Sequence, residues 1–212
     1  MEDALQFYLQ KIEVYWPFAA ALLAILVIFV LAHFFRRWQS GGESRVVEQL
    51  IKSNSVTYMK DIVIPDGVYG YHFIDYLALM PDVVLIIGVQ PNQGYIFGGN
   101  QIEEWTHVVN NRSYHFDNPL MKLNQYRQSL ETLLPGAQFE SKVVFLSESS
   151  FPKGKPDDVV ELDELDRLLT AYASNAPTNS PELMDSWREL QESVKGHRKT
   201  YQQEISSIST SS

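Results

Sequence analysis

The chain has 212 residues, of which 45% are apolar, and its length allows one ordinary domain with appendages. It contains no cysteine, which excludes disulfides and thiolate metal sites. The formal net charge is −9, with −6 in residues 157–212 alone, and this argues against broad nucleic-acid binding because such binding usually needs a basic surface.

The first strong feature is an uncharged apolar run at residues 16–35, interrupted only by His33. At 1.5 Å per residue, a helix of this length spans the hydrocarbon layer of about 30 Å. Tyr15, Trp16 and Trp38 flank the run as interfacial aromatic residues do. A signal peptide is the alternative, but the run is too long and no small-residue cleavage site follows. We therefore expect a single transmembrane helix.

The charges that flank this run predict its orientation. Arg36, Arg37 and Arg45 follow the span, whereas Lys11 is the one basic residue before it. The positive-inside rule then places residues 1–15 outside and the remaining chain in the cytoplasm. We expect a single-pass protein of a bacterial-type inner membrane, with the lipid bilayer as its first partner.

After the span, the pattern predicts a helix and then a strand. Ser40 can cap the helix, with Glu43 three residues later as its reciprocal partner. The apolar stripe of this helix is formed by Val46, Val47, Leu50 and Ile51. Residues 56–64 are rich in β-forming side chains and end at the turn Pro65-Asp66-Gly67.

The stretch from His72 to Gly99 contains two apolar runs joined by the turn Met80-Pro81-Asp82, and a third run, Tyr95-Ile96-Phe97. Bounded runs of this length, rich in Val, Ile and aromatic residues, are strand signals. Asp75 lies inside the first run, where an unpaired carboxylate would be costly to bury. It can also pair with a nearby cation or cap a turn, which is the structural alternative to a catalytic role.

The remaining elements alternate between strands and helices. The pattern predicts strands at 104–109, 113–116 and 143–146, a helix that Asn118-Pro119 opens with leucines at 120, 123, 130, 133 and 134, a helix at 162–169, a C-terminal helix at 181–203 and a disordered tail at 204–212. This order predicts an α/β fold with a mixed central sheet flanked by helices.

Several motifs occur in an order that resembles one known family, the nuclease-related domain (NERD). They are Gly42-Glu43, Ile74-Asp75, Gly94-Tyr95-Ile96-Phe97-Gly98, Trp105, Asn118-Pro119 with Gln125, and Val143-Val144-Phe145. The resemblance implies a restriction-endonuclease-like fold over residues 40–172. It also implies metal-dependent phosphodiester hydrolysis, with Mg²⁺ as the cofactor.

The family's chemistry needs a divalent metal ion that activates water, held by carboxylates from neighbouring strands, and a lysine two residues after the second acid. The resemblance assigns Asp75 and Glu43 as metal ligands. Gly88 and Gln90 stand where the family has the glutamate and the lysine. The expected remnant of the catalytic site is therefore Asp75, Glu43 and Gln90.

Two functions follow from this departure. In the first, the domain is a non-catalytic interaction module or a nucleic-acid-related module. In the second, it is a metal-dependent nuclease with a rearranged site, in which Asp82, Glu103 or Glu104 has taken over the lost acid.

A third interpretation concerns the C-terminal helix. Leu183, Trp187, Leu190 and Val194 form an apolar stripe at 4-3-4 spacing, which would suit a protein partner. Packing of this stripe back on the domain is the interpretation that we favour. The basic loop Lys153-Gly154-Lys155 is read as solvated surface.

Overall fold

The computed structural model describes the backbone of residues 42–67 and 70–210, with side chains as far as residue 196. From Glu43 onward the chain forms one compact unit. The predicted transmembrane helix at 16–35 and the segment before it lie outside the described residues. Among the helices that are described, none is both long enough and apolar enough to span a membrane.

The main sheet has five strands in the order β1-β2-β3-β7-β9. They are β1 (Thr57–Pro65), β2 (Tyr71–Leu79), β3 (Val84–Gln90), β7 (Phe139–Phe145) and β9 (Val159–Glu161). The first three are antiparallel neighbours, whereas β7 runs parallel to β3 and β9 parallel to β7. This mixed sheet confirms the α/β class that the sequence predicts.

A second, four-stranded sheet was not expected. It has the order β6-β5-β4-β8, from β4 (Gly94–Phe97), β5 (Glu104–Val109), β6 (Arg112–Asp117) and β8 (Ser149–Ser150). The strands predicted at 104–109 and 113–116 are present, but they belong to this second sheet and not to the central one. Strand β3 of the main sheet ends at Gln90, and Gly94, with φ 85°, turns the chain into the second sheet.

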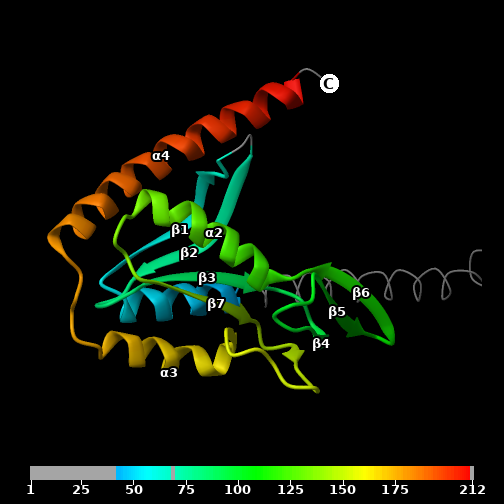
Figure 1. The fold of residues 1–212 in the computed structure, drawn as a ribbon. Coiled ribbons are helices and arrows are strands. Elements are labelled where there is room, and N and C mark those ends of the chain that lie inside the picture. The colour runs from blue at the N-terminus through cyan, green and yellow to red at the C-terminus, as the bar shows by residue number, and fades with distance from the viewer. Residues whose placement is uncertain (1–41, 68–69, 211–212) are drawn as a thin grey trace, which may run out of the picture. The chain divides into compact units, whose positions relative to one another are not determined.

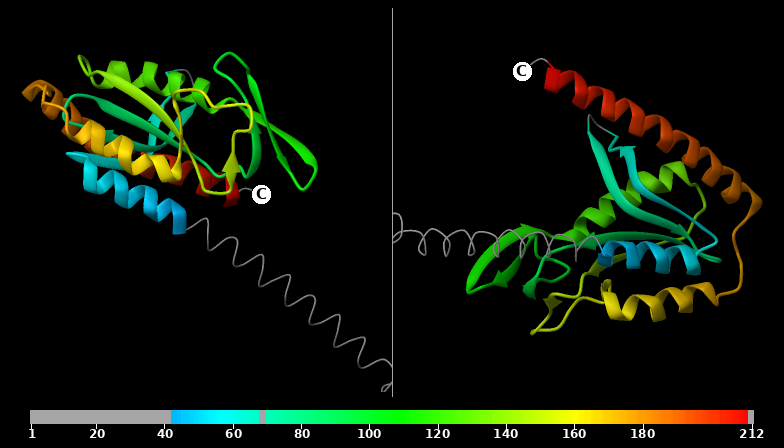
Figure 2. Two further views of the ribbon diagram at one scale, coloured as in Figure 1. Left: turned by 90° about the horizontal axis from the view of Figure 1, so that it is seen from below. Right: turned by 180° about the vertical axis from the view of Figure 1, so that it is seen from behind.

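Helices cover both faces of the main sheet. They are the helix of residues 42–54, α2 (Pro119–Leu133), α3 (Leu162–Ala173) and α4 (Pro181–Thr210). The helices α2 and α4 pack on one face, and the helix of residues 42–54 lies beside α3 on the other (Figures 1 and 2).

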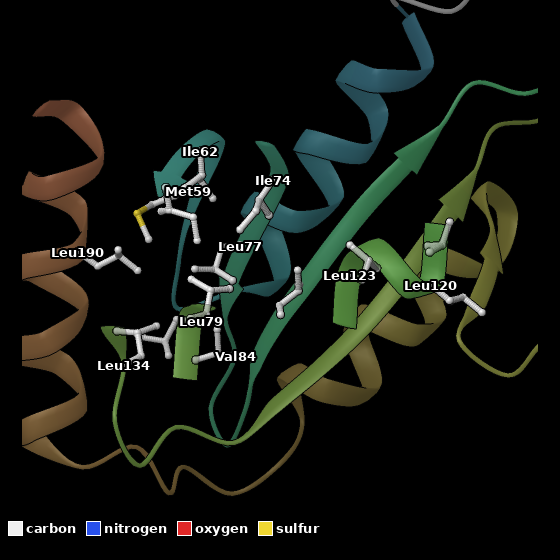
Figure 3. Packing of buried hydrophobic residues seen from close by; sticks show 14 of the residues in the cluster. Met59, Ile62, Ile74, Leu77, Leu79, Val84, Leu120, Leu123, Leu134 and Leu190 are labelled. Carbon is white, nitrogen blue, oxygen red and sulfur yellow. The ribbon is translucent and has the colours of Figure 1, made fainter. Parts of the chain in front are cut away.

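The central strand β3 has a buried side chain toward each helix layer. Val84 and Ile86 belong to the core under α2 and α4, which Figure 3 shows from close by, and Leu85 and Ile87 belong to the opposite core. A strand that is buried on both faces must be apolar at every position. The continuous apolar run in the sequence therefore marks the centre of the fold.

The helical stripes are narrower than predicted. Val47 and Ile51 are fully buried, whereas Val46 is 43% exposed. Likewise Leu134 is buried, whereas Leu133 is 38% exposed. Adjacent helical residues point about 100° apart, so only one of each pair can face the sheet.

The helix α4 packs on the domain with the stripe that the sequence singled out. Leu183, Trp187, Leu190 and Val194 are all buried in the core that α4 shares with α2 and the β1–β2 hairpin. These side chains therefore pack against the domain itself. The helix continues to Thr210, where a disordered tail from residue 204 was predicted, and that stretch contains neither proline nor glycine to end a helix.

Candidate functional site

Asp75 lies where the two central strands separate. The paired residues of β2 and β3 end at Tyr76 and Ile87. Beyond that point the backbone N–H of Val89 donates to Oδ2 of Asp75, with an N···O distance of 2.7 Å. The carboxylate therefore replaces the backbone acceptor that a continuing strand would have supplied, which is a structural role for the acid.

Both strands of the β1–β2 hairpin change their buried face at this level. Met59 and Ile62 on β1 both face the α2–α4 core, and so do Ile74 and Leu77 on β2. The members of each pair are three positions apart, whereas residues on one face of a regular strand are an even number of positions apart. The change occurs at Asp61, whose φ is +49°. Asp and Asn tolerate this left-handed conformation better than other side chains.

The register of β1 and β2 places two carboxylates opposite each other at this level. Lys60 pairs with Tyr76 and Ile62 with Ile74, so Asp61 lies opposite Asp75. Loss of hydration raises the pKa of Asp75, and the charge of Asp61 adds to this, whereas the hydrogen bond from Val89 acts in the opposite direction. The site thus disfavours a second negative charge.

Residue 88, where the resemblance to the family places a glutamate, packs against α2. Gly88 is buried, and a Cβ built on it would lie 3.2 Å from Cδ2 of Leu123, on α2. A Cβ at residue 88 would therefore require the end of the Leu123 side chain to shift by a few tenths of an ångström. Gln90, at the lysine position, is half-buried at the end of β3, and its carbonyl accepts from the backbone N–H of Leu146 at 3.3 Å.

Glu43 is half-buried near the start of the first described helix. A hydrogen bond joins its neighbour Ser44 to β2, since the hydroxyl of Tyr76 donates to the carbonyl of Ser44 at 3.4 Å. The acid of this helix that is held by strand residues is Glu48. Its carboxylate accepts from the hydroxyl of Tyr58 at 3.0 Å and from Nζ of Lys60 at 2.8 Å.

Glu48 was not predicted from the sequence, although the sequence contains a pattern that indicates its contacts. Tyr58 and Lys60 are two residues apart, so they share one face of a strand that follows an acid-bearing helix. The hydrogen bond from Lys60 lowers the pKa of Glu48. This pair is solvent-accessible, so it contributes little to stability.

Tyr126 on α2 was also missed. Its ring lies 4.9 Å from that of His72, measured between centroids. Burial raises the pKa of Tyr126, Lys122 lowers it and Asp75 raises it. The tyrosine therefore lies on the side of α2 that faces the separated ends of β2 and β3.

The acids proposed as migrated ligands lie elsewhere. Asp82 is in the turn at the far end of β2 and β3, where Nδ2 of Asn175 donates to its carboxylate at 2.9 Å. Glu103 and Glu104 are exposed at the start of β5, in the second sheet. Throughout the described residues, no three His, Cys, Asp or Glu side chains are grouped so that they could hold a metal ion. Within the described residues, Asp61 and Asp75 are therefore a pair of carboxylates without a third such ligand beside them.

A second polar centre lies at Asn118, which is 1% exposed. Its Nδ2 donates to the carbonyls of Gly99, Asn100 and Ile102 at 3.2, 3.3 and 2.8 Å, and its Oδ1 accepts from the N–H of Leu120 at 2.9 Å. One side chain therefore caps α2 and also holds the loop between β4 and β5.

The neighbouring motif residues serve the same loop. A Cβ on Gly98 would lie 2.1 Å from Cδ2 of Trp105, which is fully buried. The indole N–H of Trp105 donates to the carbonyl of Gly99 at 3.1 Å. Asn118, Gly98 and Trp105 therefore form one structural unit, which we call the loop anchor.

The basic loop divides into two roles. Lys155 binds the carboxylates of Glu161 and Glu164, at the start of α3. Lys153 lies over the ring of Phe97, 5.6 Å from its centroid, beside a surface hollow of about 550 Å³. The loop thus joins α3 to the second sheet, which the reading as solvated surface did not anticipate.

Comparison with known proteins gives one match. The family model of the nuclease-related domain matches residues 38–146, which extend from before the first described helix to the end of β7. Searches of curated proteins and of solved structures each returned no match. The matched region covers half of the chain and includes both the separated strands and the loop anchor. The chain therefore belongs to the nuclease-related domain family.

Proposed function

We propose that this chain is a membrane-anchored NERD protein whose cytoplasmic α/β domain, of the restriction-endonuclease-like type, acts as a non-catalytic interaction module. Its first partner is the lipid bilayer of a bacterial-type inner membrane. The anchor is supported by the uncharged run at 16–35 and by the arginines that follow it.

The single observation that carries the non-catalytic assignment is the contact between Gly88 and Leu123. Phosphodiester hydrolysis by this fold needs carboxylates on two adjacent strands. On β3, the ligand position is a glycine whose side-chain space adjoins a core leucine at 3.2 Å. On β2, the remaining acid, Asp75, already accepts a backbone hydrogen bond.

A nuclease assay tests this assignment. The full chain in nanodiscs is incubated with Mg²⁺ or Mn²⁺ and with mixed single- and double-stranded DNA and RNA, beside the Asp75→Ala variant. We expect no metal-dependent cleavage above the level of the variant. Cleavage that disappears in Asp75→Ala would overturn the assignment.

A gain-of-function variant sharpens the test. Gly88→Glu with Gln90→Lys restores the family's ligand and lysine, and Leu123→Ala provides space for the new glutamate. We expect Mn²⁺ binding, measured by titration calorimetry, in the triple variant but not in the double variant that retains Leu123. Equal binding by both would show that packing against Leu123 does not close the site.

The opposition of Asp61 and Asp75 favours a second candidate function, a nuclease with a rearranged site. Two carboxylates on adjacent strands can share a hard cation, and a cation would remove the cost of placing two negative charges together. This candidate predicts that Mn²⁺ binding to the unmodified chain is lost in Asp61→Asn and in Asp75→Asn. Absence of Mn²⁺ binding by the unmodified chain would rule it out.

A membrane-fractionation experiment tests the anchor separately. We expect the full chain to stay with membranes after alkaline carbonate washing, and a chain that lacks residues 1–39 to be released. Protease added to sealed inverted vesicles should digest the domain, because the proposed orientation exposes it on their outer side.

A further inference from the structure

The strand β6 forms the outer margin of the second sheet (Figure 1). It pairs with β5 through six consecutive residue pairs, and within the described part of the chain no strand pairs with its other edge. Five of its six residues are exposed. The edge of the main sheet at β1 is different, because α4 packs along it.

An open strand edge is a template for a further strand, and proteins usually protect such edges with proline, lysine or a bulge. The sequence of β6, RSYHFD, contains neither proline nor lysine, and its register with β5 has no bulge. Ring contacts of Tyr114 and Phe116 with His107 hold the strand in place. The edge is therefore formed before any partner arrives.

The hairpin geometry determines which backbone groups point outward. Asn110 and Asn111, with φ of 52° and 58°, form a two-residue turn of the primed type between Val109 and Arg112. In such a hairpin the pair next to the turn is hydrogen-bonded, and the bonding direction alternates along the strand. The N–H and C=O groups of Ser113, His115 and Asp117 therefore point away from β5.

The charge of the edge favours a second copy of the same chain. The chain carries a net charge of −9, yet β6 has one base, Arg112, at one end and one acid, Asp117, at the other. Asp117 already forms an ion pair with Nζ of Lys122 at 3.0 Å, so Arg112 is the charge that decides the orientation. Antiparallel pairing of two β6 strands places the two copies of Arg112 at opposite ends of the pair. Parallel pairing would bring like charges together.

The alternation also restricts the register. In an antiparallel pair, two opposed residues either both point their hydrogen-bonding groups at each other or both point them away. At the two-fold axis of a symmetric pair, a residue must therefore lie opposite its own copy and not opposite its neighbour in the sequence. When the pair is centred on His115, every residue with outward-pointing backbone groups is used, and Ser113 lies opposite Asp117 of the other copy. The same register sets Tyr114 opposite Phe116 of the other copy, which forms an aromatic cross-strand pair.

We propose that two copies of this chain associate through antiparallel pairing of their β6 strands, centred on His115, so that their second sheets become continuous. One strand pair buries less surface than a standard stable interface, so the association is of the weak, transient class. It is independent of whether the β2–β3 site is catalytic.

Cysteine cross-linking of the full chain in detergent tests the proposal, and the absence of native cysteine removes any background. His115→Cys places the two thiols across the two-fold axis, at the Cα separation of about 5.5 Å that a hydrogen-bonded pair provides and a disulfide accepts. The matched control is Tyr95→Cys, whose position is 58% exposed but lies on β4, inside the same sheet.

We expect His115→Cys to form disulfide dimers at least about tenfold faster than Tyr95→Cys under the same oxidant. Any association through the rest of the chain is equal in the two proteins, so the difference reports on β6. Equal rates would overturn the proposal. The register is tested by mixing Tyr114→Cys with Phe116→Cys, which should cross-link to each other faster than either does to itself.

A blocking variant completes the test. Ser113→Pro removes an N–H that points away from β5, so it should spare the hairpin and prevent a second strand from pairing. Combined with His115→Cys, it should lower the rate of dimer formation to that of the control, while circular dichroism stays unchanged. An undiminished rate in this folded double variant would contradict the proposal.

Discussion

The separated end of β2 and β3 and the loop anchor both contain residues that identify the family, but they differ in what those residues do. In the loop anchor, Asn118, Gly98 and Trp105 are joined by close packing and by hydrogen bonds to one loop. At the separated strands, Asp75 is the one acid that β2 and β3 contain, and a glycine stands beside it on β3. The loop anchor is thus held together by its own contacts, whereas the separated strands hold one acid beside a glycine.

Under the proposed non-catalytic function, this difference explains how a chain can keep a nuclease-related fold without its chemistry. A buried amide that satisfies three carbonyls cannot be replaced without leaving polar groups unpaired. An exposed metal ligand has no such role in folding. The comparison therefore predicts large stability effects in the loop anchor and small ones at the separated strands.

The largest contrast is expected between two glycine substitutions. Gly98→Ala places a methyl group 2.1 Å from the indole of Trp105, and we expect a loss of about 3 kcal/mol or more, because the ring must leave its site. Gly88→Ala meets the end of Leu123 at 3.2 Å, and we expect a loss of about 1 kcal/mol. Urea unfolding of both variants measures the difference, and equal losses would break the comparison.

Asn118→Ala should be the next most destabilising change. It removes a helix cap and leaves the carbonyls of the β4–β5 loop without their donor, for an expected total of about 2–3 kcal/mol. Asn118→Asp is the matched control, because it keeps the cap acceptor and removes only the donors. We expect an intermediate midpoint in urea for the control. A full loss in Asn118→Asp would place the whole effect in the loop.

Substitution of Asp75 should have a smaller effect, and one that depends on the new side chain. Asp75→Ala leaves the N–H of Val89 without its acceptor, and we expect a loss of about 1 kcal/mol. Asp75→Asn retains an oxygen acceptor, so below pH 3.8, where the carboxyl of Asp75 is protonated, its unfolding free energy should match that of the unmodified chain. If Asn were as harmful as Ala, the charge and not the hydrogen bond would be the stabilising feature.

The smallest expected effect is a pH dependence of that same comparison. Burial raises the pKa of Asp75 above its ordinary value of 3.8, so the folded state binds this proton more tightly than the unfolded state does. The contribution of Asp75 to stability is therefore greatest below pH 3.8 and falls as pH rises through the folded pKa. Asp75→Asn lacks this loss, so it should gain stability relative to the unmodified chain across that window in urea titrations. An opposite slope would indicate a partner cation at Asp75.

Part of the site could be predicted from local pattern. Asp75 and Gly88 fall on adjacent strands because bounded apolar runs and a Pro-Asp turn specify a hairpin. Asn118-Pro119 opens α2 because a side-chain cap and a fixed φ are local properties. In each case the determining contacts lie within a few residues along the chain.

Other parts depend on residues that are far apart in sequence. Glu48 meets Lys60 only because β1 packs beside the helix of residues 42–54. Asp61 faces Asp75 only because the register of β1 and β2 sets the two residues opposite each other. No periodicity in one segment reports such a coincidence between two.

The sequence by itself determined most of the elements, the family and the glycine at residue 88 of a predicted strand, since each is written in side-chain type and spacing. Only the tertiary structure decided that Leu123 packs against that glycine, that Asp75 serves the backbone of β3, and that β4, β5 and β6 leave the main sheet with one open edge. The physical reason is that packing and hydrogen bonding join distant segments. Their energetics therefore depend on shape and direction, which the order of residues alone does not contain.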